Sequence, residues 1–444
     1  MHCSISLLLQ FNIRRHIPQI FLRPQGPATL AIAMSEPMCD EAFSSAVDPR
    51  RARVSAAEAA LAVGGFGIGT GEFAIMGLLP QVAEDVSVSV PQAGWVISAY
   101  ALGVVVGAPL IAVLAARFSR FRVLLVLMLV FAIGNFASTI APDFYTLIAA
   151  RFFAGLPHGA YFGVAALVAA GLAAPNQRAR AVGRVMMGLT IATLFGTPLV
   201  AWFGQALGWR SAFAIVGAIS LLTMALTFVH VPRDKGNPKA TPLRELGALG
   251  RLQVWLMLGI CAIGCGGMFA VFSYITPALT EVAGVSLANV PIMLSVFGAG
   301  MILGNIVGAR LADWALVPAI GIAIVFNIFA YVLFYFTMGN PWIAIVNVLF
   351  IGGGFAVVPG VQTRLMDVAG EAQTLAAALS HSAFNLANAL GAWLGGVSIA
   401  AGYGWTSTGL VGAVLGVAGF GIFLASVFVD RAQPARMAAK PAAE

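Results

Sequence analysis

The stretch GGFGIGTGEF, residues 64–73, places one carboxylate, Glu72, among closely spaced glycines. Two kinds of chemistry are compatible with this pattern. From Gly69 onwards it fits G-x-G-x-x-G/A, the fingerprint of loops that hold a dinucleotide phosphate between a strand and a helix. Inside a membrane, in contrast, glycines let helices approach closely, and a carboxylate there usually faces a cavity or a partner.

Composition separates these alternatives. Hydrophobic residues make up 60% of the 444 residues and charged residues only 9%, whereas soluble domains carry about 25% charged residues. The segment 56–82 contains only two charges, Glu58 and Glu72, and about 20 apolar residues are enough to cross a bilayer. We therefore interpret the glycine-rich stretch as part of a transmembrane helix, and the dinucleotide interpretation fails.

Two more ionisable side chains, Arg151 and His158, lie deep in an apolar segment. A charge at the centre of a membrane helix costs about 2.5–3.5 kcal/mol on insertion scales, so it usually has a partner or a function. Glu72 and Arg151 are predicted at similar depths. They form either a static ion pair or a proton-carrying carboxylate tuned by a cation, and both interpretations stay open. His158 is either a packing histidine or a member of the same proton pathway.

The apolar runs predict an all-α polytopic membrane protein with twelve spans. Their approximate ranges are 57–82, 92–115, 122–141, 146–171, 179–204, 210–231, 253–279, 290–312, 316–337, 341–362, 374–401 and 407–429. A charged stretch rich in Pro and Gly separates six spans from six. The predicted organisation is a leader (1–55), a six-helix bundle (56–231), a cytoplasmic linker (232–252), a second six-helix bundle (253–430) and a cytoplasmic tail (431–444).

Lysine and arginine concentrate in alternate loops, which predicts that those loops and both termini are cytoplasmic. Arg210 is the exception in the opposite loops. The net charge of +7 is thus a topology signal and does not indicate nucleic-acid binding. The leader is expected to be disordered, to form a lipid-surface helix, or to result from a start assigned too early, with Met34 as the true start instead of Met1.

The two halves of the chain repeat. A shift of 197 residues matches the pairs Pro80/Pro277, Glu84/Glu281, Gly107/Gly304, Leu114/Leu311 and Gly155/Gly352. A shift of 196 residues places GWRSAF (208–213) on GWTSTG (404–409). A duplicated six-span unit is typical of transporters whose halves rock about a central site.

From residue 56 to residue 430 the chain resembles the major facilitator superfamily, and in particular its drug:proton antiporters of the arabinose-efflux and sugar-efflux type. GTGEFAIMGLLPQVAEDVSVS is similar to the first helix and loop of that group, and RFFAGLPHGAYFG is similar to the fourth-helix motif, with Arg151, Gly155 and Gly159 in register. The resemblance implies a transporter of the bacterial inner membrane that uses a proton gradient. No cofactor, metal or nucleic-acid partner is expected, and the protein is expected to be a monomer in the lipid bilayer.

Two further motifs of this resemblance concern gating. APLIAVLAARFSRFRVLL occupies the place of the loop motif G-x-L-a-D-R-x-G-R-r, in which Arg117 and Arg120 fit but Ala116 replaces the acid. The second half keeps that acid as Asp313. GLTIATLFGTPLVAWFG is similar to the antiporter motif of span five, where the matching residues are Gly188, Gly196 and Pro198. We expect this motif to pack tightly on the cytoplasmic side and to favour export.

The positions equivalent to Glu72 and Arg151 in the second half are the neutral residues Phe269 and Val348. We therefore assign proton coupling to the first half, through Glu72, Arg151 and His158. Substrate contacts are assigned mainly to the second half, with these candidate cavity residues: Phe73, Tyr274, Gln362, His381, Asn385 and Asn388. The last three share one face of span eleven, although a polar stripe of this kind also serves simply to join helices.

The predicted function is proton-coupled export of small molecules such as drugs or sugars by alternating access. A proton-coupled uptake symporter and a non-transporting membrane sensor are the alternatives. An enzyme is not expected, because no cluster of His, Asp or Glu gathers at one membrane face, and no Walker loop supports ATP-driven transport. Cys261 and Cys265 are expected to pack as small apolar side chains, since two thiols alone make a poor metal site.

The charge asymmetry makes a testable prediction about topology. Reporter fusions after Asp143 and Gly339 should report the outside of the cell, and a fusion after Lys235 should report the cytoplasm, because basic loops stay inside. A cytoplasmic signal after Asp143 would overturn the assigned topology.

Overall fold

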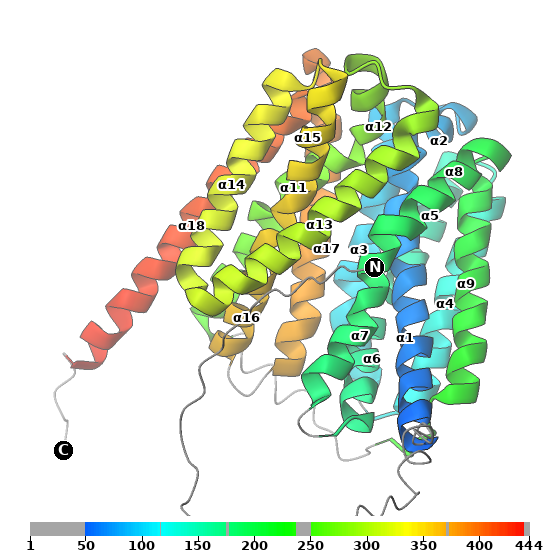
Figure 1. Cartoon of the computed structure of the whole chain (residues 1–444), viewed down its shortest axis with the longest axis vertical. Coiled ribbons are helices and arrows are strands. Elements are labelled where there is room, and N and C mark those ends of the chain that lie inside the picture. Colours follow the sequence, from blue (N-terminus) through cyan, green and yellow to red (C-terminus); the bar gives the residue numbers. More distant parts are fainter. Residues whose placement is uncertain (1–48, 116, 175–176, 237–249, 370–372, 439–444) are drawn as a thin grey trace, which may run out of the picture. The chain divides into compact units, whose positions relative to one another are not determined.

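Long apolar segments fold as helices in a bilayer because every backbone N–H and C=O must then be paired within the segment. A computed structural model describes residues 49–115, 117–174, 177–236, 250–369 and 373–438, and these contain no β-strand. Twelve of their helical segments are long and apolar enough to span a membrane, which confirms the all-α polytopic fold (Figure 1). The spans agree with the predicted ones to within a few residues at most ends.

The first half contains α1 (Pro49–Phe73), α2 (Leu79–Asp85), α3 (Val90–Ala115), α4 (Arg120–Ile140), α5 (Phe144–Gly155), α6 (His158–Leu172), α7 (Arg178–Ile191), α8 (Thr197–Leu207) and α9 (Arg210–His230). The second half contains α10 (Leu252–Gly259), α11 (Gly266–Ser273), α12 (Ile275–Pro277), α13 (Val290–Trp314), α14 (Leu316–Thr337), α15 (Pro341–Gly353), α16 (Val357–Ala369), α17 (Gln373–Ser398) and α18 (Ser407–Ala438). Short 3-10 or π segments join several of them.

The ends of the described chain differ from the prediction. Helix α1 begins at Pro49, so residues 49–55 are helical and do not belong to the leader. Residues 1–48, which contain the rest of the predicted leader and to which its three alternatives apply, are outside the described residues. Helix α18 extends to Ala438, so the first part of the predicted tail continues the last span. The boundaries of the two bundles and of the linker remain predictions.

Span one ends earlier than predicted, at Gly77 instead of residue 82. The helix breaks at Leu78 (φ −121°, ψ 6°), two residues before Pro80, because proline has no N–H to pair with the carbonyl of Met76, four residues earlier. Any other residue at position 80 could donate its N–H to the carbonyl of Met76. That carbonyl accepts instead from Thr276 Oγ1 of the second half, at 3.0 Å.

Span seven breaks at the matching place. Tyr274 (φ −115°, ψ 22°) interrupts it three residues before Pro277, so this span ends at Ser273 instead of residue 279. The two interrupted spans therefore meet through the hydrogen bond between Thr276 and Met76. The proline pair that revealed the repeat also creates a contact between its copies.

Close contacts between glycines and backbone carbonyls recur at the same spacing in both halves, which supports the repeat. A Cβ atom on Gly103 would lie 2.2 Å from the carbonyl oxygen of Phe152, and one on Gly300 would lie 2.2 Å from that of Leu349, 197 residues later in both cases. Two further pairs repeat in the same way: Gly107 and Gly304 against Leu156 and Gly353 (2.1 and 2.4 Å), and Gly155 and Gly352 against Tyr100 and Phe297 (2.1 and 2.2 Å).

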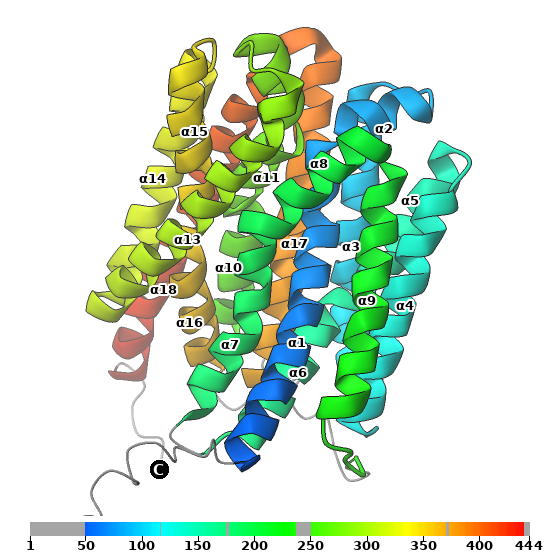
Figure 2. The same ribbon diagram turned by 45° about the vertical axis from the view of Figure 1, so that its right-hand side comes forward.

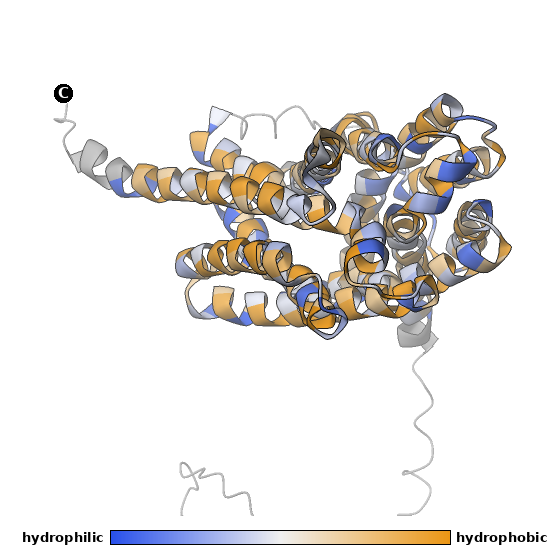
Figure 3. Cartoon of the chain, turned by 90° about the horizontal axis from the view of Figure 1, so that it is seen from above, coloured by the Kyte–Doolittle hydropathy of each residue, from blue (hydrophilic) through white to orange (hydrophobic). Residues whose placement is uncertain are grey.

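We name the two ends of the spans by their connections. The hairpin end carries residues 78–89 and the matching residues 275–286, and the linker end carries residues 231–236 and 250–251. In Figures 1 and 2 the ribbons of the halves lie close at the hairpin end, drawn uppermost, and diverge towards the linker end. Figure 3 shows apolar residues along the outward faces, where Ile140, Phe336 and Phe428 are at least 74% exposed. Such surfaces suit lipid contact.

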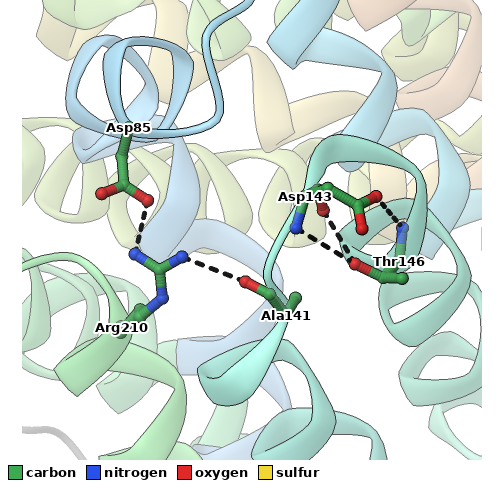
Figure 4. A network of polar contacts seen from close by, with 5 residues as sticks. All are labelled: Asp85, Ala141, Asp143, Thr146 and Arg210. Carbon is green, nitrogen blue, oxygen red and sulfur yellow. Dashed lines mark hydrogen bonds and ion pairs between the residues drawn. The ribbon is translucent and has the colours of Figure 1, made fainter.

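Arg210, the basic exception at the hairpin end, joins three connections of the first half. Its guanidinium pairs with Asp85 and donates to the carbonyl of Ala141 at 3.0 Å (Figure 4). In the same view Asp143 caps α5 by accepting from the backbone N–H of Thr146. It also accepts from the N–H of Tyr145. The hydrogen bond from Thr146 is the main cause that lowers the pKa of Asp143. The one basic side chain of these loops is therefore neutralised locally.

In the second half, the corresponding acid at the hairpin end has a hydrogen-bond partner that is not an arginine. Trp405 Nε1 donates to Glu281 at 2.7 Å, and these residues lie 196 positions after Trp209 and Asp85. In the first half the indole N–H of Trp209 is buried without a partner among the described residues. In the structure Glu281 therefore corresponds to Asp85 of the first half, and not to Glu84, with which the shift of 197 residues had paired it.

The glycine contacts predict a difference between two neighbouring substitutions. Gly352→Ala puts a methyl group 2.2 Å from the carbonyl of Phe297, so α13 and α15 must separate, and overpacking of this kind costs ~1–3 kcal/mol. In Gly353→Ala the added atom meets Phe326 at 3.5 Å, an ordinary contact. Thermal unfolding of the purified proteins should show a lower midpoint for Gly352→Ala alone. Equal midpoints would contradict the close approach.

Candidate functional site

Glu72 lies in the last turn of α1 and is buried, with 6% of its surface exposed. Its Oε1 accepts a hydrogen bond from Asn388 Nδ2 at 3.2 Å. Asn388 belongs to α17 of the second half and is fully buried. The next residue, Phe73, contacts Phe272 of the second half edge-on, with ring centroids 5.9 Å apart. The acid of the first half is therefore held by a residue of the other half.

Arg151 of α5 is fully buried beside this acid but does not form a salt bridge with it. Its Nη2 donates to the carbonyl of Gly71 at 2.8 Å, and Nη1 lies 3.5 Å from Asn135 Oδ1. The guanidinium carbon lies 4.3 Å from the ring centroid of Tyr100. The described residues contain three salt bridges, and none joins Glu72 to Arg151. In this arrangement the arginine binds the peptide next to Glu72, so the static ion pair considered from the sequence is not formed.

His158 extends the same cluster towards α17. Its Nδ1 lies 3.1 Å from the hydroxyl of Tyr100, and its ring centroid is 6.3 Å from that of His381. His381 stacks on Phe162 with centroids 5.4 Å apart and nearly parallel planes. Tyr100 thus touches both Arg151 and His158. The three proton-coupling candidates lie in one buried cluster that reaches the second half at Asn388 and His381.

Tyr100 and Asn135 were missed from the sequence. A comparison of the repeat, position by position, could have found both, because the residues 197 places later are Phe297 and Val332. The same shift replaces His158 by Phe355, as it replaces Glu72 and Arg151 by apolar residues. The polar residues that the first half contributes to the cluster therefore have no polar counterparts in the second half, while the packing around them repeats.

The other candidate cavity residues have different surroundings. Tyr274 is fully buried and donates to the carbonyl of Ala392 in its own half at 2.7 Å. It also packs on Gly94 of the first half, where a Cβ atom would lie 2.1 Å from the tyrosine hydroxyl. Asn385 donates to the carbonyl of His381 in its own helix, at 3.0 Å. Gln362 is half-buried on α16, and its side chain makes no hydrogen bond with a described residue. Their contact with substrate remains a prediction.

Helices α3 and α17 form the longest contact between the halves. Their antiparallel seam has approaches of Pro91 to Gly396, Ser98 to Ala389 and Val105 to Ser382, at intervals of seven residues in each helix. Ser98 Oγ donates to Ala389 O at 3.1 Å, and Ser382 Oγ to Val105 O at 3.4 Å. Seven residues are two helical turns, so small residues recur on the facing sides. These contacts close the interface from the hairpin end to the middle of the spans.

The span-five motif packs on α1. A Cβ atom on Gly188 would lie 2.0 Å from the carbonyl of Ala62, and one on Gly196 would lie 2.3 Å from Thr70 Oγ1. Pro198 is buried in the first turn of α8. The tight packing is present, but its location differs from the prediction. It runs from the middle of α1 towards the hairpin end, whereas we expected it on the cytoplasmic side.

The gating residues of the loop motif are exposed. Arg117, Arg120 and Asp313 lie at the linker end, and the side chain of Asp313 makes no hydrogen bond or ion pair with a described residue. An acid does reach the first-half loop from another place. Asp234, after α9, accepts from Ser119 Oγ at 2.7 Å and from the N–H groups of Arg120 and Phe121 at 3.0 Å.

Asp234 thereby caps the N-terminus of α4. Partial burial raises the pKa of its carboxyl, but the hydrogen bonds from Phe121, Ser119 and Arg120 outweigh that effect and lower the pKa overall. Gly236 (φ 74°) approaches the carbonyl of Arg117, where a Cβ atom would lie 2.7 Å away. The chain after span six is thus fastened to the loop whose own motif lacks its acid.

Metal ligation finds no support within the described residues, which contain no group of three or more His, Cys, Asp or Glu side chains able to hold an ion. Cys261 and Cys265 are both buried and free.

Comparison with known proteins places these observations in a family. The model of the Major Facilitator Superfamily matches residues 61–375. The inner membrane transport protein YdhP of Escherichia coli (strain K12) is 39% identical over 377 residues, which cover 84% of this chain and 96% of YdhP. The chloramphenicol resistance protein of Streptomyces lividans is 32% identical over 337 residues (74% and 86%), and the probable sugar efflux transporter of Pasteurella multocida (strain Pm70) is 27% identical over 371 residues (82% and 90%).

Among solved structures, the D-xylose-proton symporter superposes with a TM-score of 0.65 at 17% identity, over 82% of this chain and 97% of the symporter. A likeness at this identity concerns the fold.

The hydrogen bond between Asn388 and Glu72 makes a prediction about the two halves. Asn388→Ala removes the donor that the second half offers to Glu72, so the hairpin end should open more often. Spin labels at Tyr145 and Trp342, two exposed and equivalent positions of the hairpin end, should then show longer distances by pulsed electron resonance. Asn385→Ala is the matched control, because Asn385 bonds only its own helix. Identical distance distributions in both variants would refute a latch at Glu72.

Proposed function

Because this chain belongs to the major facilitator superfamily and is a multi-pass inner-membrane transporter, we propose that it exports small molecules in exchange for protons. The linker end, where basic residues gather, is assigned to the cytoplasm together with both termini. A single chain contains both six-span halves, so a monomer suffices for alternating access. The energy source in this proposal is the proton gradient, and no cofactor takes part.

The observation that carries the proposal is the partner of Glu72. In the present arrangement the carboxyl group accepts from Asn388 across the interface and lies next to the peptide held by Arg151. When the halves rock apart, Asn388 moves with the second half while Arg151 stays with the first. The proton affinity of Glu72 must therefore differ between the two arrangements. A group whose protonation differs between two global states couples proton transfer to their exchange.

The proposed substrates are small organic molecules with hydrogen-bond donors. Asn385 Oδ1 and Asn388 Oδ1 are buried and accept no hydrogen bond from a described residue, so both can accept from hydroxyl or amino groups. Phe73 and Phe272 supply apolar faces beside them. The names of two relatives, a chloramphenicol resistance protein and a probable sugar efflux transporter, are compatible with such substrates.

Export is favoured over uptake by the resemblance of span five to the antiporter motif and by its tight packing on α1 at Gly188 and Gly196. Helices that approach this closely leave little room for a proton leak beside the acid. An antiporter depends on that seal, because a leak would dissipate the gradient without moving substrate.

The test is transport by Glu72→Gln in inside-out vesicles. A growth-inhibition panel of antibiotics, dyes and sugars in a pump-deficient host first identifies a substrate. Vesicles with an acidic lumen should accumulate that substrate with the unmodified protein. Glu72→Gln should lose this proton-driven accumulation and keep exchange of labelled for unlabelled substrate, because glutamine retains the shape but binds no proton.

Glu58→Gln is the matched control from the same helix. Glu58 is buried and paired with Arg184 at 2.6 Å. Because 37% of the Arg184 side chain is exposed, water can solvate it when Glu58 is replaced, so this variant should fold and transport uphill. Proton-driven accumulation by Glu72→Gln would exclude the coupling role, and substrate accumulation only under an opposite gradient would exclude export.

A further inference from the structure

A pocket of about 650 Å³ opens at the linker end of the first half. Its walls are the start of α1, the end of α6, the end of α9 and the segment that follows α9. The lining residues are Arg53, Val54, Gly171, Leu172, Phe228, Val229, His230, Val231, Pro232 and Arg233. Three of them, Arg53, Leu172 and His230, are the terminal residues of membrane spans. The pocket therefore lies at the level where lipid headgroups begin.

The charge of the pocket is positive. Arg53 and Arg233 both line it, no acid does, and no acid among the described residues forms a salt bridge with either arginine. The acid nearest in sequence, Asp234, is occupied by Ser119 and by two N–H groups of α4. The guanidinium of Arg233 lies over the rings of Phe121 and Phe228, at 5.6 and 5.2 Å, which keeps it in place.

The side of the pocket towards the membrane is apolar. Phe228 and Val229 are 57% and 71% exposed, and the exposed residues Leu221 and Leu222 continue along α9 towards the hairpin end. A basic pocket at headgroup level that continues into an exposed apolar helix face matches a molecule with an anionic head and a hydrocarbon chain. A free anion has no hydrocarbon chain and would make no contact with this apolar face.

We propose that this pocket binds the phosphodiester headgroup of an anionic membrane phospholipid, with Arg53 and Arg233 facing the phosphate and one acyl chain along α9. Lys and Arg side chains near a membrane surface each contribute about 1 kcal/mol to the attraction of anionic lipid, and guanidinium groups suit phosphate because they donate two parallel hydrogen bonds. The bound lipid would join α1, α6 and α9 at one end of the half that contains Glu72. The inference stands independently of the direction and coupling of transport.

Lipid binding is tested by native mass spectrometry of the purified full chain in detergent. Titration with dioleoyl-phosphatidylglycerol should show one tightly retained lipid, and dioleoyl-phosphatidylcholine should be retained more weakly. Arg53→Gln should weaken retention of the anionic lipid about fivefold, the equivalent of one basic residue. The double variant with Arg233→Gln should weaken it further. The side chain of Arg53 forms no hydrogen bond or ion pair with a described residue, so the single variant Arg53→Gln remains informative if the double variant unfolds.

Arg310→Gln is the matched control, since Arg310 is exposed at the linker end of the second half and lines no part of this pocket. Unchanged retention in Arg310→Gln supports a specific site, whereas an equal loss would reduce the effect to general attraction and overturn the proposal. Equal retention of the two lipids would also overturn it. Displacement of the lipid by sn-glycerol 3-phosphate or inorganic phosphate at similar concentrations would assign the pocket to a soluble anion instead.

Discussion

A carboxyl group removed from water must find its hydrogen-bond partners inside the protein, and Glu72 takes its partner from the opposite half of the chain. This one requirement connects the features around it. The amide of Asn388 can reach Glu72 only when α17 lies against α3, and that contact depends on small residues repeated every seven positions along the seam. The pairing of one acid is therefore tied to the position of two six-span units. The hydrogen bond at Glu72 is therefore lost when the two units separate.

The twelve spans were predictable from the sequence because the bilayer imposes one simple rule on every segment: apolar length with internally paired backbone. Their ends were less certain where proline intervened. The breaks at Leu78 and Tyr274 follow from Pro80 and Pro277, residues that the repeat had already singled out, yet an apolar run continues through both positions. Hydropathy alone does not register a helix break. A proline does indicate one, because the carbonyl four residues before it loses its N–H partner, and Pro80 and Pro277 should have shortened spans one and seven.

The partners within the site were harder to anticipate. Sequence placed Glu72 and Arg151 at similar depths, but depth does not determine rotation about a helix axis, and Arg151 turns its donors to Gly71 and Asn135. Tyr100 was overlooked because a tyrosine in an apolar span looks like packing until its counterpart, Phe297, is considered. The comparison of the halves shows the general pattern: glycine-to-carbonyl contacts are retained at the same spacing, whereas the polar side chains between them exist only once. The two halves share their backbone packing, and the polar side chains around Glu72 distinguish the first half from the second.

Tyr274 determines which movements the interface permits. Its hydroxyl lies where Cβ atoms on Gly94 of α3 and Gly396 of α17 would be, at 2.1 and 2.4 Å, so the ring fills space left by two missing side chains. Sliding α3 along α17 would carry Gly94 away from the ring and bring another side chain of α3 against it. Separation perpendicular to the seam moves α3 away from the ring and meets no such obstacle. The tyrosine therefore opposes a change of register between the two helices and favours a hinge-like opening in which that register is preserved.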